Sequence, residues 1–373
     1  STNNEAYQAR ASVRLKKNDV EGAVKDLEVV LLKDPTNQAI AGVAIQKLAD
    51  MDRIDEAKDL ITKMLASKPS EGMYRMRAIL YRNQNDPEKA LSDLNKAIAM
   101  QPKDPLSLIM RAEVSLDRKD VSAAKTDLRA AEELAPQLKD SDKGIMLRSQ
   151  IAIAEERYVD AINDAKLLVE RIPDNVERNL FLANLYSLDK RPRKAIDVYS
   201  ALLAKDSKNT VVLRARGDML LAVGDHAAAV DDYEVVAQSL GNIEDIEPTE
   251  RQKREAAGAY NNLSWVLATS PVDSVRDGKR ALEYGEKAAR LSDYRAPHIL
   301  STLAAAYAES GEFEKAIEWS SKAVEIGGDE DHAQLEQLQQ ELDSYKQGKP
   351  WREKQETEEN DVPLLGPEDL IDT

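Results

Sequence analysis

The chain has 373 residues, of which 68 are acidic and 52 basic, giving a formal net charge of −16, and it contains no cysteine. A negative charge of this size repels nucleic-acid phosphates and anionic membranes, so we expect no nucleic-acid partner. The absence of cysteine excludes disulfides, thiolate metal sites and cysteine nucleophiles.

Composition and hydropathy indicate the fold class and the compartment. The residues are 42% hydrophobic but only 5% aromatic, and period-two β-branched runs are absent, which predicts an all-α fold. No stretch approaches the roughly 18–20 apolar residues that cross a bilayer, so we expect a soluble protein without membrane insertion. The chain begins with Ser1 and not with Met, which favours an exported protein, periplasmic or secreted, over a cytoplasmic one.

An alanine recurs in a fixed local context along the chain. Apolar or small residues follow it at four and seven residues, which is the spacing of one helix face. In the first five copies a proline follows at twelve residues, where a helix would end. The alanines lie 33–37 residues apart, except for one interval of 52, at Ala23, Ala57, Ala90, Ala124, Ala161, Ala195, Ala229, Ala281 and Ala316.

A second helix is predicted upstream of each of these alanines. Twelve residues before the alanine comes a small side chain, as in Ala11 and Gly217, if five extra residues are allowed in the eighth copy. Ile45 in the second copy breaks this rule. Small residues at both positions let two antiparallel helices approach closely. Turn and capping signals such as Gly224-Asp225 separate the two helices.

This small residue, the alanine twelve residues later and the helix-ending proline, on a 34-residue period, resemble the tetratricopeptide repeat. The resemblance implies a right-handed α-solenoid of about nine helix-turn-helix repeats. We assign repeats 1–7 to residues 4–241, and an irregular linker with repeats 8 and 9 to residues 242–328. A solenoid's last repeat exposes an apolar side, so we predict a capping helix within 329–351, with Leu338 and Leu342 on one face.

The C-terminal part carries a second resemblance, to a recurrent terminal module of bacterial tetratricopeptide repeat proteins. It covers residues 260–351, and its marks are the segments 261–269, 276–278, 302–309 and 345–353. The resemblance implies no known chemistry. Residues 352–373 form an acidic tail, for which we favour an inert solubilising role. Its apolar residues leave open that it docks in a groove, including self-association with a second copy.

A row of arginines precedes the small residue in five repeats. These are Arg10, Arg77, Arg111, Arg148 and Arg216. One interpretation is an anion-binding row. The interpretation we favour is that the stems cover apolar surface while the guanidinium groups reach water or a neighbouring carboxylate.

The sequence contains none of the motifs that carry chemistry. The three histidines, His226, His298 and His332, form no metal-ligand pattern, and no nucleophile elbow, phosphate-binding loop or dinucleotide fingerprint occurs. We therefore predict no catalytic residue, no metal site and no cofactor, and the chain is not expected to be an enzyme.

The resemblance implies that the first helix of each pair lines a concave groove. Mapping the family's groove positions onto this sequence gives ten candidates for protein or peptide binding: Arg75, Arg82, Asn83, Glu113, Gln150, Asn184, Arg214, Asp218, Asn261 and Trp265. The three arginines are expected to be isolated basic spots. We hypothesise a scaffold that binds a protein or peptide segment in this groove. The alternative is a structural subunit that assembles through its outer surface or its tail.

Overall fold

The computed structural model describes residues 2–17, 19–34, 38–241, 243, 248–327, 332–353 and 359. Over these ranges the chain forms helices and turns but no strand, which confirms the all-α prediction. It divides into two compact units, Ser1–Ala165 and Lys166–Thr373, called unit 1 and unit 2 and described separately below. Most of the predicted acidic tail and part of the predicted linker lie outside the described residues.

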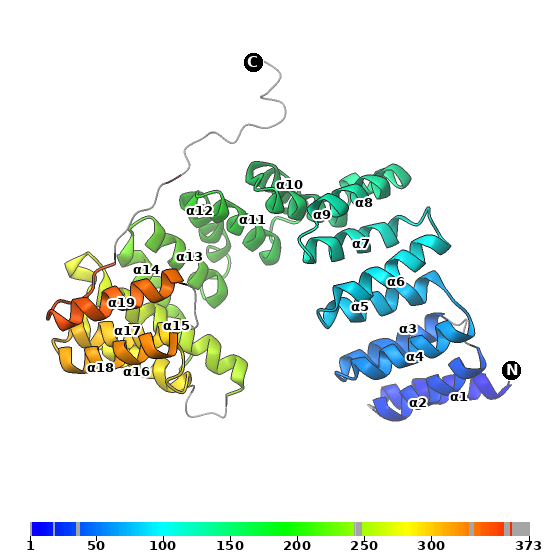
Figure 1. Ribbon diagram of the computed structural model, residues 1–373, viewed down its shortest axis with the longest axis horizontal. Coiled ribbons are helices and arrows are strands. Elements are labelled where there is room, and N and C mark those ends of the chain that lie inside the picture. The colour runs from blue at the N-terminus through cyan, green and yellow to red at the C-terminus, as the bar shows by residue number, and fades with distance from the viewer. Residues whose placement is uncertain are drawn as a thin grey trace, which may run out of the picture. The chain divides into compact units, whose positions relative to one another are not determined.

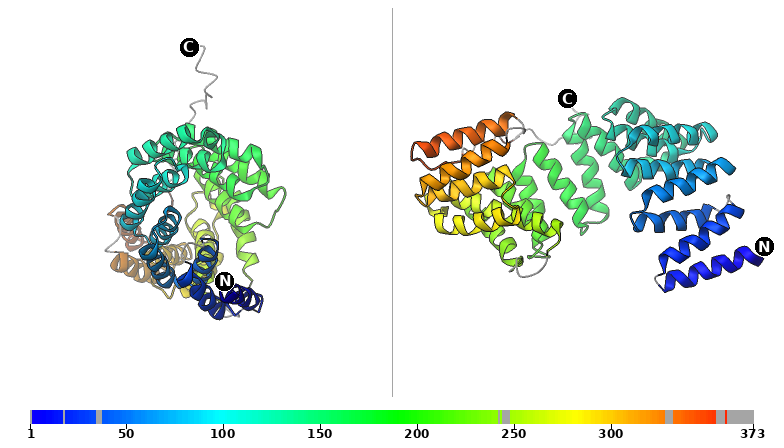
Figure 2. Two further views of the ribbon diagram at one scale, coloured as in Figure 1. Left: turned by 90° about the vertical axis from the view of Figure 1, so that its right-hand side faces the viewer. Right: turned by 60° about the horizontal axis from the view of Figure 1, so that its bottom comes forward.

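Unit 1 is a stack of antiparallel helix pairs in which successive helices pack side by side (Figures 1 and 2). The short 3-10 helix η1 (Pro136–Asp140) connects α8 to α9, and α10 continues into unit 2. The helices are α1 (Thr2–Lys16), α2 (Val20–Lys33), α3 (Gln38–Asp50), α4 (Ile54–Ser67), α5 (Glu71–Asn83), α6 (Pro87–Met100), α7 (Pro105–Asp117), α8 (Val121–Leu134), α9 (Asp142–Ala154) and α10 (Tyr158–Arg171).

Unit 2 continues the helix pairs and ends on a single helix, α19, which packs against α18 and α17 where the capping helix is predicted. A 3-10 turn, η3 (Asp273–Val275), lies between α15 and α16. The helices are α11 (Val176–Leu188), α12 (Pro192–Leu203), α13 (Thr210–Ala222), α14 (His226–Ser239), α15 (Glu250–Thr269), α16 (Gly278–Leu291), α17 (Pro297–Glu309), α18 (Phe313–Ile326) and α19 (His332–Lys346).

The recurring alanines are the contact points of the helix pairs. All nine are 0% exposed, from Ala23 in α2 to Ala316 in α18. A larger side chain at any of them would separate the second helix of the pair from its neighbours, because protein interiors are close-packed. The sequence repeat therefore coincides with the repeat of buried helix–helix contacts in the structure.

In seven of the helix pairs that the structure describes, the turn places one residue in the left-handed region. This residue lies five positions before the recurring alanine and has φ between 56° and 84°, and only two of the seven are glycine: Asp52, Asn85, Lys119, Glu156, Lys190, Gly224 and Gly311. The following N–H donates to the carbonyl five residues back, as from Asp120 to Ser115 at 2.8 Å. Asp120 then caps α8 by accepting the Ala123 N–H at 3.0 Å. The turn thus ends one helix and begins the next within two residues.

An ion pair spans the two helices in every repeat of the arginine row. In the fourth repeat the Arg111 guanidinium donates to both carboxylate oxygens of Asp127, at 2.8 and 2.7 Å. Each acceptor is sixteen residues after its arginine and at most 8% exposed: Asp26, Asp93, Asp127, Asp164 and Asp232. The anion-binding interpretation of the row is therefore wrong, and the neighbouring-carboxylate interpretation is confirmed.

Three of these guanidinium groups also reach the preceding repeat. Arg111 donates to Asn95 at 2.7 Å, Arg77 to Thr62 at 2.8 Å, and Arg216 to Ser200 at 3.1 Å. Each of these acceptors lies five residues after the recurring alanine of the repeat before. The arginine therefore bonds its helix to the second helix of its own pair and to that of the preceding pair.

Repeats without the arginine replace both partners of the ion pair by apolar residues. In the sixth repeat Leu182 takes the arginine position and Val198 the aspartate position; in the ninth, Leu303 and Trp319 do so. A half-replaced pair would leave a buried charge alone, which is strongly unfavourable, whereas a fully apolar pair is not. The two positions therefore change together.

Residues from the segments that mark the terminal module make contacts that hold the end of unit 2 together. Glu309 of α17 pairs with Arg276, at 3.1 Å, and with Arg352, at 2.7 Å. The chain after α19 then runs along the end of α15, where the Glu353 N–H donates to the Thr269 carbonyl at 3.0 Å. These contacts therefore join α15, α17 and the segment that follows α19 into one packed end.

Candidate functional site

The ten predicted groove residues divide equally between the two units. Unit 1 carries Arg75, Arg82, Asn83, Glu113 and Gln150, and unit 2 carries Asn184, Arg214, Asp218, Asn261 and Trp265. Each unit brings some of its five residues together. The two groups differ in how their polar atoms are occupied.

The two arginines of unit 1 are engaged by acidic residues of the next repeat. Arg75 donates to Asp104, at 2.7 Å, and Asp104 in turn caps α7. Arg82 pairs with Asp117, at 2.5 Å, and with Glu113, at 2.8 Å. The prediction that these arginines are isolated basic spots is therefore wrong.

A small hollow of about 210 Å³ adjoins the Arg82 ion pairs. Arg82, Glu113 and Gln150 line it, so the structure brings three of the five predicted unit 1 residues together. Lys143 also pairs with Glu113. Asn83, at the end of α5, is exposed and does not line this hollow. The local charges are thus already balanced by protein groups.

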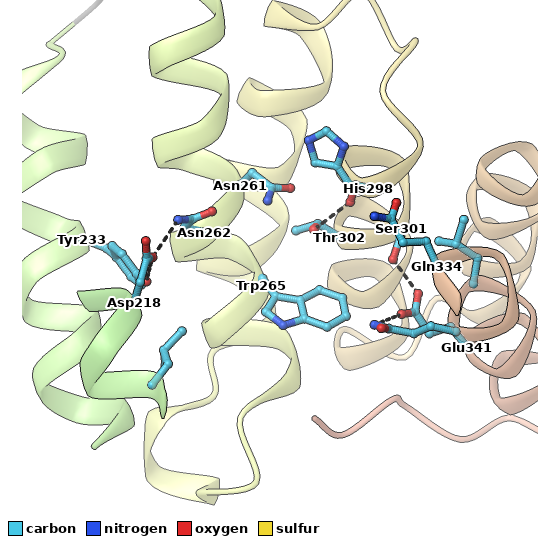
Figure 3. A pocket seen from close by; sticks show the side chains of 13 residues that line it. Asp218, Tyr233, Asn261, Asn262, Trp265, His298, Ser301, Thr302, Gln334 and Glu341 are labelled. Carbon is cyan, nitrogen blue, oxygen red and sulfur yellow. Dashed lines mark hydrogen bonds between the residues drawn. The ribbon is translucent and has the colours of Figure 1, made fainter. Parts of the chain in front are cut away.

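Unit 2 contains a larger cavity, of about 450 Å³, that is lined by residues of five helices, α13, α14, α15, α17 and α19 (Figure 3). Asp218 comes from α13, Asn261 and Trp265 from α15, and these three are predicted groove residues. The other lining residues are Leu221, Tyr233, Asn262, His298, Ser301, Thr302, Gln334, Gln337, Leu338 and Glu341. The cavity is of the size that small-molecule and side-chain sites have in proteins.

A close approach of two helices sets Asp218 in place. A Cβ on Gly217 would lie 2.6 Å from the Tyr233 ring, so this small position is what admits the tyrosine. The Tyr233 hydroxyl donates to Asp218 at 2.6 Å, and the Asn262 amide donates to the same oxygen at 3.3 Å. Desolvation raises the pKa of the Asp218 carboxyl, whereas the Tyr233 hydrogen bond and the positive charge of Arg214 lower it, and the net shift is upward. One side of Asp218 remains exposed to solvent.

Trp265 and Asn261 lie one helical turn apart on α15, facing the cavity (Figure 3). The Trp265 indole N–H donates to Glu353 at 2.9 Å, so its donor is already used inside unit 2. Asn261 Oδ1 is buried and has no hydrogen-bond partner among the described residues. A buried acceptor without a donor is costly, so it calls for a ligand or water.

Glu341 of α19 is the most buried ionisable group at the cavity and was missed by the sequence prediction. It is 0% exposed and accepts hydrogen bonds from Ser301, at 2.5 Å, and Gln337, at 2.9 Å. Burial raises the pKa of this carboxyl, those hydrogen bonds lower it, and the nearby Glu353 carboxylate raises it further. The signal in the sequence was its position between Leu338 and Tyr345, on the apolar face of the helix.

The remaining predicted residues of unit 2 lie outside this cavity. Arg214 lines a neighbouring cavity of about 380 Å³, which shares Asp218 with the first. Asn184 is exposed on α11 and lines neither cavity. Among the residues that the structure describes, no group of three or more His, Asp or Glu side chains is placed to hold a metal ion. No helix over the described ranges combines the length and the apolarity that crossing a membrane requires.

The helices form an α-solenoid of antiparallel pairs, and polar cavities lie among the helices of unit 2. A family model for the tetratricopeptide repeat matches residues 75–139, which cover most of α5 through α8 and the start of the following connection. The helix pairs within this segment therefore match the tetratricopeptide repeat, in agreement with the resemblance seen in the sequence.

Two curated proteins share detectable sequence similarity with the chain. Tetratricopeptide repeat protein 36 of Caenorhabditis elegans is 37% identical over 91 residues, which is 24% of this chain and 45% of that protein. DnaJ homolog subfamily C member 3 of Gallus gallus is 25% identical over 321 residues, covering 68% of this chain and 63% of that protein. The chain thus spans less than two thirds of either relative.

Two solved structures support the fold at low sequence identity. A tetratricopeptide repeat protein from Parabacteroides merdae aligns with a TM-score of 0.53 and 17% identity, over 69% of this chain and 99% of that one. A signal transduction ATPase with numerous domains and a tetratricopeptide repeat sensor, from Pyrococcus horikoshii, aligns with a TM-score of 0.64 and 16% identity, over 91% of this chain and 55% of that one. Similarity at this level concerns the fold alone.

Proposed function

We propose that the chain is a non-enzymatic scaffold that binds a protein or peptide segment, and that the cavity of unit 2 is its principal contact site. The observation that supports this most directly is the convergence of α13, α14, α15, α17 and α19 on one cavity that holds three of the predicted groove residues. Repeat arrays use such concave walls for binding, but fold alone does not fix a function.

The chemistry of the wall suits an extended peptide. The side-chain amides of Asn261, Asn262 and Gln334 offer donors and acceptors to a peptide backbone, which needs both along its length. Trp265 supplies a large aromatic surface between them, and tryptophan is enriched among residues that dominate binding energy. The proposed contact set is thus Asp218, Asn261 and Trp265, extended by Glu341.

A selection from a random peptide display library against the full chain tests this function. We expect selected peptides to lose about 30-fold in affinity when Trp265→Ala removes the aromatic surface, measured by calorimetry. The matched pair Trp265→Phe and Trp319→Phe controls for general loss of aromatic packing, because Trp319 stacks on Tyr294 and does not line the cavity.

The assembly alternative predicts a different result. Peptides or partners that bind Trp265→Ala, Asn261→Ala and the wild type equally, but lose binding when residues 354–373 are deleted, would contradict the groove proposal. Circular dichroism and hydrogen exchange on each variant separate a lost contact from a lost fold.

A further inference from the structure

Two polar groups at the unit 2 cavity, Asn261 and Glu341, have unused capacity to accept hydrogen bonds. Asn261 Oδ1 has no partner among the described residues. The two oxygens of Glu341 accept one hydrogen bond each, from Ser301 and Gln337. A carboxylate offers about four acceptor positions, so this buried group can accept further donors that enter from the cavity.

The charge around the cavity is negative. Asp218 and Glu341 lie on opposite sides of it, with Trp265 between them (Figure 3), and Glu353 accepts the indole N–H of Trp265. No lysine or arginine is among the described residues that line the cavity, and His298 on α17 is the basic side chain there. Tyr233 and Tyr345 are the other titratable groups nearby, both buried and uncharged at neutral pH.

Two arginines lie near the cavity without lining it, and the charge of Arg214 acts on Asp218. Arg352 pairs with Glu309 and donates to the Ala268 carbonyl at 3.3 Å. Arg214 lines the neighbouring cavity. The repulsion between Glu353 and Glu341, which contributes to the raised pKa of Glu341, is therefore left for a ligand to relieve.

We propose that this cavity binds the guanidinium group of an arginine side chain of the peptide ligand. The proposal rests on the proposed function and names the chemistry that the same site recognises. A guanidinium presents five donors in a plane, which suits acceptors spread around a cavity, and it stacks favourably on tryptophan. A lysine ammonium is a compact point charge and matches spread acceptors less well.

The test uses defined probes on the full chain. The probes are acetyl-Ala-Ala-Arg-Ala-Ala-amide, the same peptide with lysine or with the uncharged arginine analogue citrulline, and ethylguanidinium alone. The protein is labelled with 5-fluorotryptophan, and Trp265→Phe and Trp319→Phe assign the fluorine resonances among its three tryptophans. Binding is followed at pH 7.5 by fluorine NMR titration.

We expect the arginine peptide and ethylguanidinium to shift the Trp265 resonance. The citrulline peptide should bind at least about tenfold more weakly, because it lacks charge-assisted hydrogen bonds. Glu341→Gln should weaken binding of the arginine peptide about tenfold and leave the citrulline peptide unchanged. Glu133→Gln, an exposed position on α8, is the matched control and should change neither.

Each other outcome has a defined meaning. Equal binding of arginine and citrulline peptides at Trp265 overturns the cation proposal and leaves the proposed function standing. Tighter binding of the lysine peptide overturns the choice of guanidinium. A Trp265 shift with ethylguanidinium but with none of the peptides contradicts the peptide function while the cavity chemistry stands. No shift with any probe overturns the inference.

Discussion

The charged residues predicted to line a groove in unit 1 and the charged residues at the unit 2 cavity have their hydrogen-bonding groups satisfied in different ways. In unit 1, Arg82 neutralises Glu113 and Asp117 of the next repeat, and the hollow beside these ion pairs measures about 210 Å³. In unit 2, Asn261 and Glu341 keep acceptor capacity that no described protein group uses. Polar side chains in this fold can therefore either bond neighbouring repeats to one another or keep hydrogen-bonding capacity that a ligand could use.

The added helix α19 brings side chains to the unit 2 cavity that the regular repeat does not supply, whereas Asn261 and Trp265 of α15 occupy groove positions of the repeat. Glu341 comes from α19, and Trp265 is fixed by Glu353, which follows α19. The irregular end of the chain thus provides most of what distinguishes the two regions.

The largest expected effect concerns the buried ion pairs, four of which lie in unit 1. Arg111→Leu leaves Asp127 buried without a partner and should destabilise the protein by about 3 kcal/mol. Arg111→Leu with Asp127→Val copies the apolar pair of the sixth repeat and should restore most of this loss. Urea unfolding with hydrogen exchange at α7 and α8 measures both. A double variant as unstable as the single one would contradict the exchangeability of the two pair types.

The next effect concerns the packing beneath the cavity. Gly217→Ala should cost about 1–3 kcal/mol despite the higher helix propensity of alanine, because the new Cβ meets the Tyr233 ring. Combining it with Tyr233→Leu copies the Ala112 and Leu128 pair of unit 1. The double variant should lose less stability than the two single losses added together. Strict additivity in a double-mutant cycle would show that the two positions do not share one space.

A smaller effect concerns the protonation of Glu341. Its pKa is raised in the folded state, mainly by burial, so the stability that its proton provides is present below the unfolded pKa and is lost as pH rises through the folded pKa. The Gln side chain of the Glu341→Gln variant does not titrate. The free energy of unfolding of this variant relative to the wild type should therefore rise between pH 4 and pH 7, by on the order of 1 kcal/mol. Unfolding midpoints across this range check it, with Glu133→Gln as control. A difference that is flat with pH, or that falls, would contradict the raised pKa.

The smallest effect is expected in the unit 1 groove. Arg82→Ala removes two partly exposed ion pairs and should cost less than about 1 kcal/mol. It should also leave the affinity for the arginine peptide unchanged, as calorimetry can show. A large loss of peptide affinity would mean that unit 1 binds the ligand as well, and the contrast between the two regions would have to be abandoned.

Much of the fold was predictable because the repeat marks its own contacts. The nine recurring alanines all proved fully buried, and the arginine row proved to face carboxylates. The lining of the unit 2 cavity was predictable only in part: Asp218, Asn261 and Trp265 follow from groove positions of the repeat. Glu341 does not, because its role depends on how α19 packs, and one carboxylate on an apolar helix face does not reveal the neighbours it will meet. The pairing of Arg82 with two acids likewise depends on side-chain reach between repeats.

The arginine and its aspartate always belong to the same helix pair, sixteen residues apart. A gene duplication or deletion that adds or removes one whole repeat therefore adds or removes both charges together, and neither is left buried without its partner. The hydrogen bond to the preceding repeat is less demanding of the residue type, since Asn, Thr and Ser all serve as acceptor. An array built in this way can change its length by recombination without first acquiring compensating substitutions.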